Sequence, residues 1–230
     1  MTVDLAAMSA APIAAKGDPS TAFAVPSQYE NFAHAWLRVK VLQVFAVGVI
    51  VVPGTAIALA LSQEPTEEGG VWTWSVDVGA STIDLDVTAG LAQGWDVDLF
   101  VTNPNEGLDR FRWVAGDSNL AATDGTWMLH DPELPASNTE ALAIEWNYVS
   151  DTDRSLAYVV RNTESPEFGD SLTLTIAGTT ASLQYVDADS PSIAAEIRWD
   201  ESGAGQIEVP GFNSGVAACW NTSFENTPCE

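Results

Sequence analysis

Lysine is absent after residue 40, and acidic residues dominate the chain that follows. The 230 residues include 32 acids and eight bases, and 29 of the acids but only five bases, all arginine, follow residue 62. This part therefore carries the whole net charge of −24. So acidic a surface repels nucleic acids and anionic lipids. We expect no nucleic-acid partner, and a domain that stays soluble and tolerates salt.

Histidine and cysteine are also scarce, which limits the chemistry that the chain can perform. His34 and His130 are the two histidines, and neither has the neighbours of a zinc site or of a Ser-His-Asp triad. Phosphate-binding and dinucleotide-binding motifs are absent as well. The two cysteines, Cys219 and Cys229, predict a disulfide that closes the C-terminal tail, with two unpaired thiols as the alternative. We expect that the protein is not an enzyme.

Charge is missing altogether from residues 41–61. At the helical rise these residues span about 31 Å, the thickness of a bilayer core. Arg38 and Lys40 precede the segment and three glutamates follow it by residue 68, so the N-terminus is predicted to be cytoplasmic. A signal peptide cleaved near residues 58–60 is the alternative, but its apolar run would normally be 7–15 residues long. We expect a retained single pass through the cytoplasmic (inner) membrane, with the lipid bilayer around residues 41–61.

The residues before this segment predict a lead into the same helix. Residues 1–26 are rich in Ala, Pro and Ser, which predicts an extended N-terminal segment. Ser27 and Glu30 have the spacing of a capping box, so we expect an interfacial plus transmembrane helix over residues 27–62. Aromatic and basic side chains gather at the interfaces of such spans. The residues expected to lie at the membrane interface or to dock on partner subunits are Tyr29, Phe32, Trp36, Arg38 and Lys40.

Beyond a polar linker at residues 63–70, apolar and polar residues alternate with a period of two. Many short runs of this kind at regular spacing predict an antiparallel β-sandwich over residues 71–230, outside the membrane and therefore periplasmic in a bacterium. The runs are 71–78, 83–87, 95–102, 110–115, 126–130, 142–148, 156–160, 172–176, 183–186, 193–199 and 206–209.

Part of this region resembles a known family. The residues that carry the resemblance are Ile83–Val87, Asp96–Val101, Asn103–Asn105, Leu156–Val160 and Leu172–Ile176. Together they resemble the bacterial pre-peptidase C-terminal domain over residues 71–177, which implies a jelly-roll-like β-sandwich. Some members bind calcium through acidic loops, which by analogy implies Asp96 and Asp98 as ligands. The chain departs from the family pattern because no peptidase is attached and about 50 residues follow the matching region, so the resemblance implies a fold more than a function.

Calcium is the metal that the residues themselves would suit. It takes six to eight oxygen ligands from carboxylates, amides and carbonyls. Asp96, Asp98, Asn103 and Asn105 lie on one strand and the loop after it, so we take them as a candidate calcium site. Solvated surface charge is the alternative.

The predicted membrane anchor, together with the absence of catalytic motifs from the sequence, favours a structural role. We expect a non-enzymatic accessory or structural subunit of a larger membrane protein complex, with other membrane protein subunits as its partners. By analogy, respiratory or photosynthetic assemblies would suit such a subunit. The alternative is a membrane-tethered binding module for calcium, a glycan or an external protein. Co-purification in mild detergent would discriminate the two, because only the subunit retains stoichiometric partners.

Overall fold

The computed structural model describes residues 26–89 and 94–229, with the backbone alone for residues 40–52 and 191–193. The predicted N-terminal segment, 1–26, therefore lies outside the described residues except for Pro26. A 3-10 turn, η1 (Ser27–Tyr29), leads into one long helix, α2 (Glu30–Ala60). The strands that follow are β1 (Thr66–Glu68), β2 (Val71–Val78), β3 (Ser81–Ala89), β4 (Gly94–Asn103), β5 (Leu108–Asn119), β6 (Asp124–His130), β7 (Glu140–Ser150), β8 (Asp153–Val160), β9 (Ser171–Ala177), β10 (Thr180–Asp187), β11 (Ser190–Asp200), β12 (Gly205–Glu208), β13 (Ala218–Trp220) and β14 (Asn226–Thr227), with a second 3-10 turn, η2 (Asn213–Gly215), before β13.

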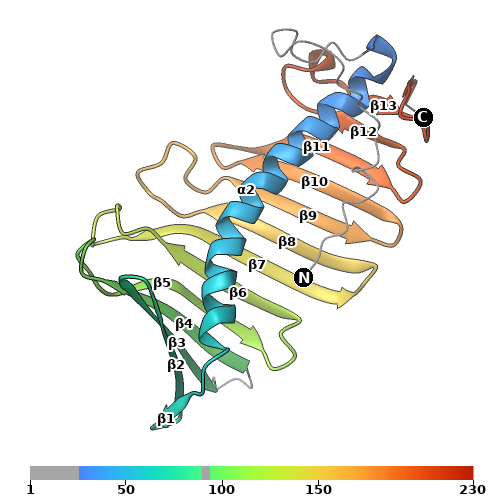
Figure 1. The fold of residues 1–230 in the computed structure, drawn as a ribbon. Helices are drawn as coiled ribbons and strands as arrows, with labels where there is room; N and C mark the ends of the chain where they lie inside the picture. The colour runs from blue at the N-terminus through green and yellow to red at the C-terminus, as the bar shows by residue number, and fades with distance from the viewer. Residues whose placement is uncertain (1–25, 90–93, 230) are drawn as a thin grey trace.

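The fourteen described strands form one antiparallel sheet in which each strand pairs with its neighbours in the chain. Short turns make this order possible. The turn from β9 to β10 has two residues, and Gly178 adopts a φ of 62° there. Glycine enters this left-handed region without the steric cost of a Cβ atom. The result is a meander, β1 to β14, that twists along its length (Figure 1).

The alternation of residues gives the sheet one apolar and one polar face. Cross-strand pairing connects Trp74, Leu85, Leu99, Val114 and Leu129 in one row across β2 to β6. The next row, on the opposite face, contains Thr73, Asp86, Asp98, Ala115 and Met128. The apolar face therefore needs a cover, whereas the polar face does not.

Helix α2 supplies that cover by crossing the apolar face diagonally (Figure 1). Near its start it packs on β11 to β13, where Phe32, Ala35 and Val39 are buried with Ile197 and Trp220. Near its end it packs on β2 and β3, and on the core beneath them. There Ala56 and Ala60 are buried against a group that comprises Ile83, Leu85, Leu99, Val114, Leu129, Ile144 and Tyr158. Two separate cores, one at each end of the helix, thus hold it on the sheet.

These observations confirm the mainly β, antiparallel class but correct the finer expectations. The predicted jelly-roll connectivity is wrong, because every described strand pairs with its sequence neighbours and none crosses over. A helix, rather than a second sheet, provides the second layer. The capping box did not form either, because α2 begins at Glu30 and neither it nor η1 has a side-chain cap hydrogen bond at its start.

Candidate functional site

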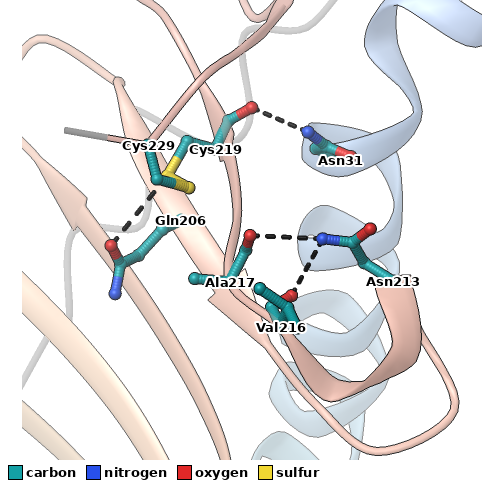
Figure 2. The surroundings of a disulfide bond; sticks show 7 residues. All are labelled: Asn31, Gln206, Asn213, Val216, Ala217, Cys219 and Cys229. Atoms are coloured by element: carbon teal, nitrogen blue, oxygen red, sulfur yellow. Dashed lines mark hydrogen bonds between the residues drawn. A yellow bond between two sulfur atoms is a disulfide. The ribbon is translucent and has the colours of Figure 1, made fainter.

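The N-terminal end of α2 is held by the C-terminal tail. The backbone N–H of Asn31 donates a hydrogen bond of 3.1 Å to the Asn226 side-chain oxygen. The Asn226 amide in turn donates to the Ser27 carbonyl at 2.7 Å. The Asn31 amide donates to the Cys219 carbonyl, also at 2.7 Å (Figure 2). Asn226 therefore satisfies an N–H that the first turn of a helix leaves without an intrahelical partner.

The tail that carries Asn226 is closed by the predicted disulfide, which the structure confirms. Cys219 and Cys229 are bonded, with their Cα atoms 5.2 Å apart. Between them β13 and β14 share two residue pairs, Cys219 with Thr227 and Trp220 with Asn226. So short a hairpin has little ladder to stabilise it. The disulfide is consequently the strongest connection between the last residues and the sheet.

Phe32 lies in the protein's own core, which corrects its expected place at a membrane interface. Its side chain is 3% exposed and its ring centroid lies 4.4 Å from that of Phe224 and 5.9 Å from that of Trp220. The Trp220 indole N–H donates to the Gly203 carbonyl at 2.7 Å. Trp36 packs partly buried against the same core. The aromatic face of the helix is thus directed to β13 and the tail.

The other predicted interfacial residues have mixed positions. The Arg38 guanidinium lies 3.1 Å from His34 Nδ1 and donates to the His34 carbonyl at 3.1 Å. The His34 ring in turn lies 4.2 Å from the Phe212 ring, between centroids. Tyr29 is half-buried at the start of α2, and the side chain of Lys40 lies outside the described residues. Whether Tyr29, Arg38 and Lys40 meet a membrane or a partner stays a prediction.

Exposed leucines lie on the outward side of α2 and directly after it. Leu37 and Leu59 are 46% and 41% exposed, and Leu61, which follows the last helical residue, is 51% exposed. The predicted span begins with residues 41–52, whose side chains lie outside the described part. Within the part of the chain that the structure describes, no helix has both the length and the apolar character needed to cross a membrane.

The predicted calcium ligands fall into two places. Asp96 and Asp98 share the polar face of β4, and Asp98 pairs with Arg112 at 2.5 Å. Asn103 is buried at the end of β4 and accepts a 3.0 Å hydrogen bond from the backbone N–H of Asn105. Asn103 lies five positions beyond Asp98 along the extended strand, a distance of about 17 Å. Among the described residues, moreover, no three His, Cys, Asp or Glu side chains gather in a group able to hold a metal ion.

His130 ends β6 on the same polar side. Its Nδ1 lies 2.9 Å from the Thr139 hydroxyl oxygen. Burial lowers the pKa of His130, and the positive charge of Arg112 lowers it further. A neutral imidazole with a threonine partner is consistent with a structural histidine.

Sequence reasoning missed Asn31, Phe224 and Asn226, which hold the helix to the tail. Asn31 and Asn226 are 195 residues apart, and no local spacing connects them. The two cysteines were the one feature of the sequence that pointed to this contact. A disulfide fixes the tail in place, and a fixed tail can serve as a docking surface for the helix.

Comparison with models of known protein families gave no match, and no curated protein matches the chain. The resemblance to the pre-peptidase C-terminal domain stays a prediction.

Proposed function

We propose that the protein is a non-enzymatic structural subunit of a larger membrane protein complex. In this proposal α2 is the element that contacts lipid or the helices of neighbouring subunits. The observation that supports the proposal is the exposure of apolar side chains on the outward side of α2. A helix that covers a sheet in a soluble domain normally presents polar and charged residues to water. Here Leu59 and Leu61 are exposed, and residues 41–61 carry no charge.

Lipid and the helices of neighbouring subunits are the two covers that suit such a surface. In the finer form of the proposal, residues 41–61 span the inner membrane, with the N-terminus cytoplasmic and the sheet periplasmic. A spanning helix has to leave the sheet, because α2 is packed on it at both ends. The apolar face of the sheet would then need a replacement cover from a partner subunit. Both arrangements make the protein dependent on an assembly.

A pair of exposed aliphatic residues provides the test. Leu59 in α2 and Val78 at the end of β2 are 41% and 44% exposed. We expect Leu59→Asp to weaken co-purification with membrane partners in mild detergent, because it places a charge on the apolar outward side. Val78→Asp, the matched control, should have no effect. Both variants should keep the fold, as monitored by near-UV circular dichroism.

Topology is tested separately by cysteine labelling of intact cells. The native cysteines form a disulfide and do not react with maleimides. A cysteine at Ser9 should be protected from a membrane-impermeant maleimide, and one at Glu106, in the exposed turn after β4, should react. The reverse pattern would overturn the orientation. A monodisperse wild-type monomer without membranes or partners would overturn the proposed function itself.

A further inference from the structure

We propose that the disulfide-closed tail, residues 219–229, is a redox-controlled latch for the N-terminal half of α2. With the disulfide formed, the tail holds Glu30–Val39 on the sheet, and reduction releases this part of the helix. The inference goes beyond the proposed function and needs neither a membrane nor a partner to be tested.

The first step is that the tail contacts the start of the helix directly. Three groups of the tail contact the start of the helix. The Asn226 side-chain amide bonds to Ser27 and Asn31, the Cys219 carbonyl accepts from Asn31, and the Phe224 ring packs on Phe32. Two of the three, Phe224 and Asn226, lie inside the loop that the disulfide closes. The loop therefore has to keep its shape for these contacts to persist.

The second step is how little else holds that loop. The β13–β14 ladder has two residue pairs. The turn between them depends on Asn221, whose side-chain oxygen accepts the N–H groups of Ser223 at 2.9 Å and Glu225 at 3.1 Å. Phe224 has a φ of 65°, a left-handed conformation that is strained for a residue with a side chain. Two backbone hydrogen bonds close the same turn, from Asn221 to the Glu225 carbonyl at 2.9 Å and from Phe224 to the Asn221 carbonyl at 2.8 Å. Once the disulfide is opened, the tail is ordered only by this short hairpin, with a strained residue in its turn, and by its contacts with the start of the helix.

The third step is access and the fate of the sulfur atoms. Cys229 is exposed, so a dithiol reductant can reach the bond. A thiolate of the reductant attacks one sulfur of the Cys219–Cys229 disulfide and forms a mixed disulfide with it. The second thiol of the reductant then attacks this mixed disulfide and releases the protein thiol. The reductant loses two electrons and two protons and becomes a disulfide, while Cys219 and Cys229 become thiols. The Gln206 side-chain oxygen lies 4.0 Å from the Cys219 sulfur (Figure 2) and could accept from its S–H, which exists in the reduced form alone.

The two cores make the release local. The tail contacts the core around Phe32 and Trp220, whereas Ala56 and Ala60 are buried in the second core at the other end of the sheet. Opening the latch should thus free the start of α2 and leave its end docked. Parts of a protein with few remaining contacts open independently in this way.

Hydrogen exchange on the full chain in mild detergent tests the latch. Amides of residues 34–39 report on the start of α2, and those of residues 54–60 report on its end. Reduction with dithiothreitol, verified by alkylation of Cys219 and Cys229, should accelerate exchange at 34–39 by about tenfold. Exchange at 54–60 should not change. The double variant Cys219→Ser/Cys229→Ser should behave like the reduced protein.

A second variant separates the latch from a general loss of stability. Asn226→Ala keeps the disulfide but removes the amide that caps the helix, and it should accelerate exchange at 34–39 in the oxidised protein. Asn138→Ala is the matched control, since its amide donates to the Thr163 hydroxyl at 3.2 Å in loops between strands. Unchanged exchange at 34–39 after verified reduction would overturn the latch. So would an equal acceleration at 34–39 and 54–60, because the disulfide would then support the whole fold rather than one end of the helix.

Discussion

At the scale of single residues, three glycines explain how large tryptophans fit on a continuous sheet. Gly116 pairs directly with Trp127, Gly125 with Trp146, and Gly205 with Trp220. In each pair the glycine leaves room for the indole ring that lies over it, as in the known rescue of strand glycines by aromatic residues. Trp127, Trp146 and Trp220 therefore each depend on a glycine at a cross-strand position.

Gly125 gives a prediction that separates this packing role from ordinary glycine flexibility. A Cβ atom there would clash with the Asp117 carbonyl oxygen and would lie 2.5 Å from the Trp146 ring, so Gly125→Ala should lower the free energy of unfolding by about 1–3 kcal/mol. A Cβ atom at Gly54, inside α2, would meet no atom within 4 Å. Gly54→Ala should raise stability by up to about 1 kcal/mol, because alanine favours the helix. Urea unfolding followed by tryptophan fluorescence measures both, and equal effects would contradict the packing role.

At the scale of elements, the alternating runs located the long strands, but three short ones could not be found in this way. β1 lies in the predicted linker, and its residues Thr66–Glu68 are polar and exposed. β13 and β14 have three and two residues, too few to show a period. These strands form through the neighbours that they pair with. Their own sequences contain no strand signal.

The packing of α2 on the sheet is the larger feature that the sequence did not predict, and the reason is physical. A helix with apolar residues on all sides gives no indication of which side is covered, or by what. Residues 41–61 fit a bilayer as well as they fit a sheet. Likewise, alternation predicts strands but not their partners, so a meander and a jelly roll have the same pattern. The pairing of distant elements, such as Asn31 with Asn226, was not encoded in any local spacing.

Phe32 and Leu37 provide the test of docking at this scale. Phe32 is 3% exposed and Leu37 is 46% exposed on the same helix. If α2 is docked on the sheet in solution, Phe32→Ala should lower the free energy of unfolding by about 3–4 kcal/mol through the cavity that it leaves. Leu37→Ala, as the matched control, should change it by less than about 0.5 kcal/mol. An unaltered unfolding curve for Phe32→Ala would mean that the helix leaves the sheet under those conditions.

At the scale of the whole molecule, the charge is distributed as unevenly as the hydrophobicity. Three of the five arginines after residue 62 form ion pairs with carboxylates: Arg110 with Asp86, Arg112 with Asp98, and Arg198 with Glu196. These arginines are half exposed, and each such pair contributes little to stability. They nevertheless spread positive charge over a sheet face rich in acids. The remaining acids are unbalanced, and their mutual repulsion opposes the compact state.

This imbalance predicts that salt stabilises the protein. Because the Debye length falls from about 10 Å at 0.1 M to about 3 Å at 1 M, added sodium chloride should raise the melting temperature by screening the repulsion. We expect calcium chloride at equal ionic strength to give the same rise, because Arg112 already compensates Asp98 and the amides of Asn103 and Asn105 lie farther along the strand. An additional rise with calcium that chelation removes, and that Asp96→Asn abolishes, would instead establish the calcium site that the sequence predicts. A melting temperature that falls with sodium chloride would mean that the ion pairs, rather than the excess of acids, dominate the electrostatics of the fold.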